Sequence, residues 1–184
     1  MAGDDELYRQ FLSGDTASYD QLMIVYGNSL TFYIDGYTHD LQDAEDLMIE
    51  AFARIMVKKP RIQPGAFKAY LYKTGRNLAL RFAEKKRSAA LFSLEELSGE
   101  IADTLLTEDE VAARQKKEIL EMCLGRIDPQ LREALWLVYY DDLSYGEAAE
   151  IMKVSVKKID HLLARGKQMM RRELEKEGIS SAYE

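Results

Sequence analysis

The chain has 184 residues, of which 47% are hydrophobic and 31% are charged, and its formal net charge at pH 7 is −7. These proportions are typical of a folded globular protein and exclude an intrinsically disordered one. The single cysteine, Cys123, excludes an internal disulfide framework and fits a reducing compartment.

The N-terminal segment shows no pattern of export or membrane insertion. The stretch MAGDDELYRQ is acidic where a signal peptide would be basic and then apolar. The longest central run without a charged residue, 21–34, is too short to span a bilayer. We therefore expect a cytoplasmic protein without membrane insertion.

Charge is segregated along the chain. Residues 1–50 carry eleven acidic side chains and one basic side chain, whereas residues 51–87 carry eleven basic side chains and one acidic. Residues 88–112 carry seven acidic side chains and no basic one, and residues 113–184 carry thirteen of each. Such blocks indicate that different segments meet different partners.

Helical periodicity extends along almost the whole chain, and no convincing alternating strand pattern is present. In the first half, helices are predicted at about 5–12, at about 16–32, from the N-cap Asp40 to a break at Pro60, and at about 66–86. The residues expected to face the core of these helices are Tyr19, Leu22, Met23, Tyr26, Leu30, Tyr33, Leu47, Ala51, Phe52, Ile55, Met56, Phe67, Leu71, Leu78 and Phe82.

The second half begins with a change of composition. Residues 88–106 are rich in Ser, Ala, Leu, Glu and Gly, which indicates a linker with room for one helical turn near 94–97. The starts of the later helices are marked by a capping box at Thr107, by Asp128 followed by Pro129, by a capping box at Ser144, and by Ser155. These helices are expected to end near Ile127, Tyr140, Met152 and Gly178.

The predicted fold is all-α. It consists of two small helical domains, 1–88 and 108–184, joined by an acidic linker, 89–107. We see no internal repeat.

The last two predicted helices are separated by about three residues, too few for an ordinary antiparallel hairpin. Two helices joined so tightly cross steeply, as in a helix-turn-helix unit, whose second helix lies in the major groove of DNA. The alternative is an amphipathic helix with a solvated cationic face. The last helix divides into an inner face, with Ile159, Leu162, Leu163, Gly166 and Met170, and an outer face, with Lys157, Lys158, His161, Arg165 and Gln168.

A basic block, 67–87, interleaves aromatic residues with cations. Tyr70 and Tyr72 offer stacking surfaces, and Asn77 can read a base edge. This residue set is typical of a surface that handles single-stranded or partly melted nucleic acid. The alternative is a core of aromatic residues beneath a solubilising face. The cations suited to phosphate contacts are Lys73, Arg76 and Arg81.

The acidic residues Asp43, Asp46 and Glu50 are spaced three and four apart and share one helix face. Such a face could hold Mg²⁺ only with a second acidic helix opposite, for which Asp141-Asp142 is the one clustered candidate. We therefore interpret it as a solvated face or a docking surface for a basic groove. His39 and His161 are isolated, and we expect no metal, cofactor or catalytic residue.

The order of DAEDLMIEAF, FKAYLYKTGRNLAL, a linker and LSYGEAAEIMKVSVKKIDHLLARGK resembles the bacterial extracytoplasmic-function (ECF) sigma factors. These are two-domain sigma subunits of RNA polymerase, and the resemblance covers roughly residues 5–175. It implies a non-enzymatic protein that binds core RNA polymerase at the β′ clamp and β flap. It also implies recognition and melting of the promoter −10 element by the first domain and binding of the −35 element by the second.

The resemblance also implies roles for particular residues. Core-polymerase contacts would be Asp43, Asp46, Leu47, Glu50 and Phe52. Contacts to the −10 element would be Tyr70, Lys73, Arg76, Asn77 and Arg81. Contacts to the −35 element would be Lys157, Lys158, Asp160, His161, Arg165 and Gln168.

The chain departs from the family at several of these motifs. The family often has Trp at the position of Tyr70 and an acidic residue at that of Arg81. Its turn glycine is Lys153 here, and the last helix has Asp160 and Leu162 where the family commonly has a basic residue and Arg.

Three alternatives stay open at this stage. One is a self-sufficient helix-turn-helix transcriptional regulator, and another is an all-α Mg²⁺-dependent phosphohydrolase using Asp43, Asp46 and Glu50. The third is a sigma-like protein that acts only through protein contacts. The sequence also leaves open whether an anti-sigma factor is a further partner.

Overall fold

The computed structural model describes residues 3–90, 119–120 and 122–179, and every regular element among them is helical. This confirms the predicted all-α class. The chain divides into two compact units, Met1–Gly99 and Glu100–Glu184. Most of the predicted linker and the predicted capping box at Thr107 lie outside the described residues, so the predicted domain boundaries stay predictions.

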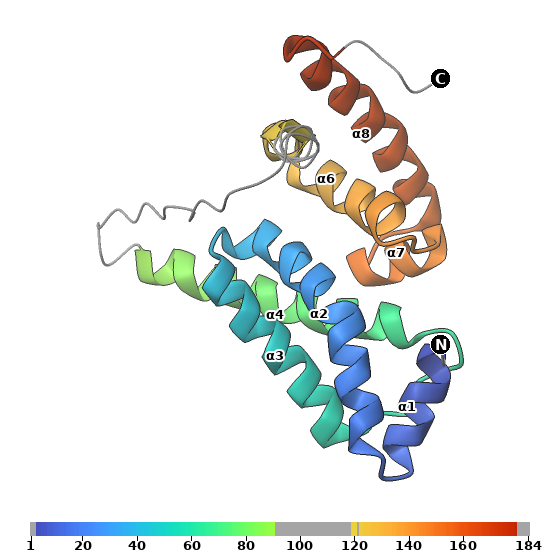
Figure 1. Ribbon diagram of the computed structural model, residues 1–184. Coiled ribbons are helices and arrows are strands. Elements are labelled where there is room, and N and C mark those ends of the chain that lie inside the picture. Colours follow the sequence, from blue (N-terminus) through green and yellow to red (C-terminus); the bar gives the residue numbers. More distant parts are fainter. Residues whose placement is uncertain (1–2, 91–118, 121, 180–184) are drawn as a thin grey trace, which may run out of the picture. The chain divides into compact units, whose positions relative to one another are not determined.

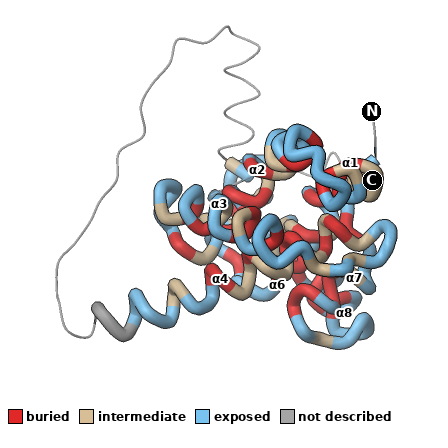
Figure 2. Tube along the Cα trace, turned by 90° about the horizontal axis from the view of Figure 1, so that it is seen from below, coloured by how far each residue is buried: buried red, intermediate tan, exposed pale blue. Residues whose placement is uncertain are grey.

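The first unit is built around α2 (Thr16–Thr38). This helix contacts α1 (Asp4–Leu12), α3 (Leu41–Lys58) and α4 (Phe67–Ala90), as Figure 1 shows. Buried and exposed residues alternate along each helix (Figure 2), because each helix turns one face inward. The largest fully buried side chains of this unit are Leu22, Leu30, Ile34, Phe52, Ile55, Phe67, Leu71 and Tyr72.

Local signals fix where these helices begin and end. The Asp15 carboxylate accepts a hydrogen bond from the Ala17 amide (3.0 Å), and the Asp40 carboxylate accepts one from the Asp43 amide (3.0 Å). The predicted N-cap role of Asp40 is therefore confirmed. At their C-termini, α2 and α3 end at His39 and Lys59, both in the left-handed region.

The approach of α4 to α2 requires a glycine. A Cβ atom added to Gly75 would lie 2.9 Å from Leu30 Cδ1 and 3.3 Å from Ile34 Cδ1. Since both of those side chains are fully buried, they have little room to move aside. Gly75 therefore sets how closely the two helices pack.

Several sequence predictions for this unit are wrong in detail. The second helix continues to Thr38 rather than about Phe32. Met56 is 44% exposed rather than inward-facing, and Phe82 is only half-buried. Tyr72 is fully buried, and its hydroxyl donates a hydrogen bond to Ser29 Oγ (2.8 Å), so it offers no stacking surface.

The second unit contains α6 (Pro129–Leu135), a π-helical turn η1 (Trp136–Tyr140), α7 (Tyr145–Met152) and α8 (Val156–Lys176). The predicted capping box at Ser144 is confirmed, and so are the N-caps at Asp128 and Ser155. The α8 helix packs against α6 and α7. A Cβ atom on Gly166 would lie 3.1 Å from Leu135 Cγ, so α8 approaches α6 closely at this point.

The turn between α7 and α8 is the short connection that the helix-turn-helix prediction requires. Lys153 ends α7 with φ 57° and ψ 46°, in the left-handed region, and Ser155 caps α8 two residues later. Among the described residues, none of the helices has the length and apolar character needed to cross a bilayer.

Candidate nucleic-acid and partner-binding surfaces

The outer face of α8 carries the cations that the sequence predicted for DNA. Ser155 Oγ accepts a hydrogen bond from the Lys158 amide (3.2 Å) and fixes the start of the helix. Backbone N–H groups at a helix start favour anions, and the lysines that follow add positive charge. All six residues predicted for this surface are exposed, namely Lys157, Lys158, Asp160, His161, Arg165 and Gln168.

The inner face of α8 accounts for one departure from the family pattern. Leu162 is 4% exposed and lies in the core of the second unit, beside Ile159 and Leu163 in the predicted inner set. Its side chain therefore cannot contact DNA in this conformation. Asp160, which is exposed, is the departure that does lie on the outer face.

An aromatic cluster beside α8 was missed by sequence reasoning. The Lys167 ammonium lies 4.5 Å from the centre of the Tyr139 ring. A hydrogen bond with Tyr139 raises the pKa of Lys167 and that of Tyr145, which begins α7. These residues lie on η1, α7 and α8, so the cluster joins the elements of the helix-turn-helix unit. Periodicity gave no signal for it, because its members come from three different elements.

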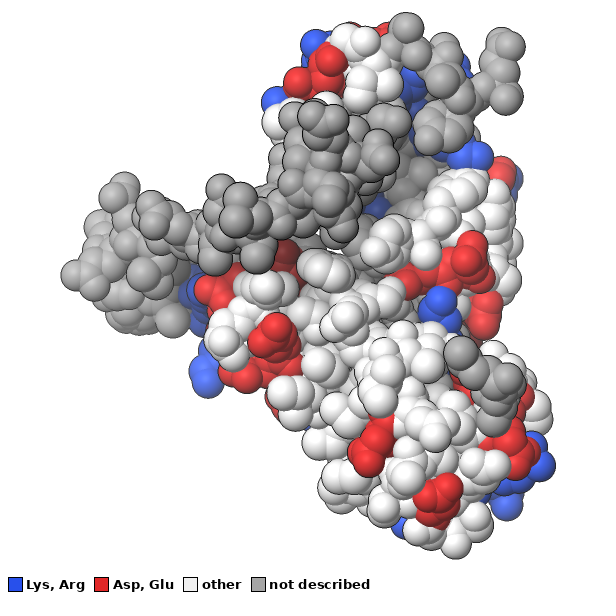
Figure 3. All heavy atoms as spheres, viewed as in Figure 1, with Lys and Arg blue, Asp and Glu red and all other residues white. Residues whose placement is uncertain are grey.

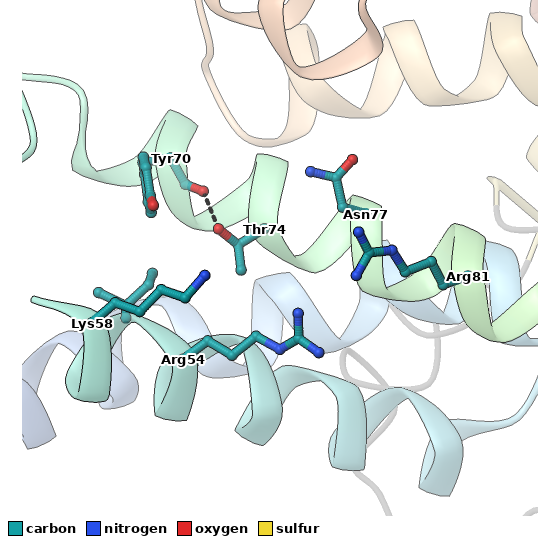
Figure 4. A pocket seen from close by; sticks show the side chains of 7 residues that line it. Arg54, Lys58, Tyr70, Thr74, Asn77 and Arg81 are labelled. Carbon is teal, nitrogen blue, oxygen red and sulfur yellow. Dashed lines mark hydrogen bonds between the residues drawn. The ribbon is translucent and has the colours of Figure 1, made fainter. Parts of the chain in front are cut away.

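In the first unit, α3 and α4 line an open surface cavity of about 160 Å³ (Figure 4). Arg54 and Lys58 extend from α3 toward α4, and the Thr74 hydroxyl donates a hydrogen bond to the Tyr70 carbonyl (2.9 Å). Three cations, an aromatic ring and an amide suit a ligand that is both anionic and planar. The lining residues are Arg54, Ile55, Lys58, Tyr70, Thr74, Asn77 and Arg81.

This cavity brings together only part of the predicted −10 set. Tyr70, Asn77 and Arg81 line it, whereas Lys73 and Arg76 are half-buried residues of α4 outside the lining. Sequence reasoning missed Arg54 and Lys58. They belong to α3, and residue spacing alone does not reveal which helix packs beside α4.

The acidic face of α3 is partly paired. The Asp43 carboxylate lies 3.0 Å from Lys86 Nζ, and Glu50 Oε1 lies 2.6 Å from an Arg54 guanidinium nitrogen. Asp46 is exposed. Figure 3 shows isolated acidic side chains on a largely uncharged surface over this part of the first unit, with lysine and arginine at its edges.

Two of the residues predicted to contact core polymerase, Leu47 and Phe52, are buried in this structure. Phe52 is 1% exposed, and its carbonyl accepts a hydrogen bond from the Tyr19 hydroxyl (2.5 Å). Leu47 is 8% exposed. Both side chains support α3 from within and cannot reach a partner in this conformation, so only Asp43, Asp46 and Glu50 remain on the accessible face.

The structure does not assemble the donor set that the phosphohydrolase alternative needs. Within the part of the chain that the structure describes, no three His, Cys, Asp or Glu side chains are placed to share a metal ion. The pairing of Glu50 with Arg54 also reduces the negative charge available on this face.

Models of known protein families match the sequences of both units. Residues 24–89 match the family model of sigma-70 region 2, and residues 117–170 match that of sigma-70 region 4. The first match contains α3, all but the last residue of α4, and the residues that line the cavity, and the second contains α6, α7 and most of α8.

Individual proteins show the same likeness. The chain is 26% identical to the ECF RNA polymerase sigma factor SigM of Bacillus subtilis over 152 residues, which cover 83% of this chain and 92% of SigM. Two solved structures share its fold. One is CnrH, a sigma factor of Cupriavidus metallidurans, in complex with the cytosolic domain of CnrY, with a TM-score of 0.65 and 22% identity over 94% of this chain and 97% of CnrH. The other is RpoE of Bartonella quintana in complex with the anti-sigma factor NepR, with a TM-score of 0.67 and 18% identity over 85% of this chain and 96% of RpoE.

Proposed function

The chain belongs to the sigma-70 family as an ECF sigma factor, and we propose how its two units divide the recognition of a promoter. It binds core RNA polymerase and directs promoter-specific initiation through the −10 and −35 elements. The assignment of the −10 element to the first unit and the −35 element to the second rests on where their basic surfaces lie. A basic cavity lies in the region 2 unit, and a helix-turn-helix with a cationic outer face lies in the region 4 unit.

The region 4 unit binds the −35 element through α8. Lys157, Lys158 and Arg165 contact phosphates, while His161 and Gln168 lie on the same face to reach base edges. Asp160 can accept a hydrogen bond from a cytosine amino group. Leu162 takes no part, since its side chain is buried.

The region 2 unit handles the −10 element at the α3–α4 cavity. Arg54, Lys58 and Arg81 supply positive charge for the backbone of a melted strand, and Tyr70 offers a ring for base stacking. Asn77, in the same lining, can read a base edge. Lys73 and Arg76 flank the cavity on α4 and extend its basic character.

Core polymerase docks on the acidic face of α3, through Asp43, Asp46 and Glu50, with the β′ clamp as the contact. Asp46 is exposed at the centre of this face, whereas Asp43 and Glu50 exchange their partners Lys86 and Arg54 for cations of the polymerase. The region 4 unit contacts the β flap. The burial of Leu47 and Phe52 holds this face rigid, which lowers the entropic cost of binding.

We also propose the following for the protein as a whole. It has no enzymatic activity of its own, acts in the cytoplasm, and consists of domains 1–88 and 108–184 joined by the linker 89–107. Because the related structures of CnrH and RpoE contain protein partners, one of them an anti-sigma factor, an anti-sigma factor is also proposed as a partner here.

The core-binding face is tested by reversing one charge. Asp46→Arg is expected to abolish pull-down of purified core polymerase, because it places a cation where a basic groove docks. Circular dichroism should show unchanged helical content. The control is Glu45→Arg, an exposed acidic residue about 100° around the same helix, which should leave the pull-down intact. Equal loss in both variants, or retention by Asp46→Arg, would contradict this docking face.

A further inference from the structure

The connection between α3 and α4, residues 59–66, directly follows Lys58, which lines the cavity, and leads into α4, whose Tyr70 also lines it. Hydrogen bonds from α1 hold this loop near both of its ends. Near its start, the Tyr8 hydroxyl donates a hydrogen bond to the Pro60 carbonyl (2.8 Å). Near its end, both carboxylate oxygens of Asp5 accept from the Gly65 amide, at 2.8 and 2.7 Å. These contacts link positions 52 and 60 residues apart in the sequence.

The first anchor lies in a packed aromatic environment. Tyr8 is 5% exposed, and its ring centre lies 5.2 Å from that of Phe67, the first residue of α4. Burial raises the pKa of Tyr8 to about 12, so its hydroxyl stays a neutral donor at physiological pH. Lys59 adds a cation–π contact, with Nζ 5.1 Å from the centre of the Phe11 ring on α1.

The second anchor depends on an unusual backbone conformation. Gly65 has φ +79°, a region that residues with a side chain rarely adopt. In this conformation, the Gly65 amide donates a hydrogen bond to the Asp5 carboxylate. Asp5 thereby holds the loop in the conformation from which α4 starts.

Between the anchors, the loop exposes Arg61, Gln63 and Pro64 to solvent. A loop of this length would otherwise sample many conformations, and a mobile loop discriminates poorly between bases. Two hydrogen bonds to a helix that itself packs on α2 remove much of that freedom. The position of the loop relative to the cavity therefore depends on α1.

We propose that α1 sets base selectivity at the −10 element by positioning the 59–66 loop, with Tyr8 and Asp5 as the positioning residues. This inference rests on the proposed function of the α3–α4 cavity. Tyr8 is buried, and the Asp5 carboxylate is engaged by the Gly65 amide, so neither residue need contact DNA itself.

The test uses the full chain with purified core polymerase and a promoter library randomised at the −10 element. The readout is the ratio of transcripts from preferred and non-preferred −10 sequences. This ratio does not change when a fraction of the protein is unfolded, because all promoters then lose activity equally. Tyr8→Phe removes only the hydroxyl that bonds Pro60, and Asp5→Asn replaces one accepting oxygen by an amide donor.

Matched controls exist in the same unit. Tyr19→Phe removes a buried hydroxyl that donates its hydrogen bond to the Phe52 carbonyl on α3 rather than to the loop. Glu6→Gln changes the neighbouring acidic residue of α1, whose carboxylate pairs with Arg9 (2.8 Å). Selectivity for the −35 element, measured with a second library, is expected to be unchanged in all four variants.

The expected result is a 2- to 10-fold fall, in order of magnitude, of the −10 ratio in Tyr8→Phe and Asp5→Asn, the range that corresponds to one hydrogen bond, with both controls at the wild-type ratio. Wild-type ratios in Tyr8→Phe and Asp5→Asn would overturn the inference, as would an equal fall in Tyr19→Phe. A wild-type protein without any −10 preference would instead contradict the proposed function of the cavity.

Discussion

At the scale of single residues, Lys153 is unusual in its backbone conformation and Tyr8 in the burial of its hydroxyl group. Lys153 adopts a left-handed conformation at the turn of the helix-turn-helix unit, where the family has glycine. Tyr8 buries a hydroxyl beside the loop that precedes α4. Both states have measurable consequences for stability.

Lys153→Gly is expected to stabilise the second unit by about 1 kcal/mol, because a Cβ atom is strained at positive φ and glycine is not. Denaturant unfolding followed by circular dichroism measures the change. Lys153→Ala removes the same charge but keeps the Cβ atom, so it should give no comparable gain. If alanine stabilises as much as glycine, charge rather than backbone strain is responsible.

Because Tyr8 is buried, the free energy of unfolding of the first unit is expected to change with pH in the alkaline range. Its pKa is raised from 10 to about 12, so between these values the folded state binds more protons than the unfolded state. The free energy of unfolding therefore falls with rising pH, by up to about 1.4 kcal/mol per pH unit from this group, and the contribution is complete below pH 10. Unfolding series at pH 9 to 11.5 should show a shallower fall in Tyr8→Phe; equal slopes would contradict this.

At the scale of elements, α8 combines two faces with opposite tolerance of charge. Asp160 is exposed on the outer face, whereas Leu162 is buried on the inner one, although both depart from the family pattern. The same substitution at these two positions should therefore have different effects.

Asp160→Arg is expected to increase the affinity of the full chain for a −35 duplex at low salt. It should also steepen the dependence of log affinity on log salt by about one for each added phosphate contact. Leu162→Arg should instead lower the free energy of unfolding by about 2 kcal/mol or more, because it buries an unpaired charge. Fluorescence anisotropy and denaturant unfolding measure the two effects. Enhanced DNA binding by a fully stable Leu162→Arg protein would show that the face assignment is wrong.

The elements also show which structural information is local in sequence. The N-caps at Asp40, Asp128, Ser144 and Ser155 were predictable, because each depends on a side chain that bonds a backbone group two or three residues away. The inner face of α8 followed from periodicity. Most of the architecture of each unit was therefore accessible from the sequence.

The parts that escaped prediction depend on contacts between distant segments. Arg54 and Lys58 join the α4 residues at the cavity only because α3 packs beside α4. The anchoring of the 59–66 loop needs Asp5, 60 residues from its partner Gly65. For Phe52, periodicity predicted a core position and the family resemblance a polymerase contact, and its burial agrees with the periodicity.

At the scale of the whole molecule, the segregation of charge along the chain explains how a protein with a net negative charge can bind DNA. The net charge is −7, yet the basic block 51–87 supplies the cations of the cavity. We expect the acidic segments to compete with DNA for these cations, so that the free protein binds promoters weakly and core polymerase supplies the missing affinity. Tight, sequence-specific binding by the isolated chain at physiological salt would point to a self-sufficient regulator.

The most direct test of the central assignment is run-off transcription with purified core polymerase over a promoter library. Adding this protein is expected to yield transcripts from a restricted set of promoters that share one −10 and one −35 sequence. Lys157→Ala combined with Arg165→Ala should remove the −35 preference while core binding is retained. Failure of the protein to direct core polymerase to any promoter, although it is folded and bound to the core, would contradict the account.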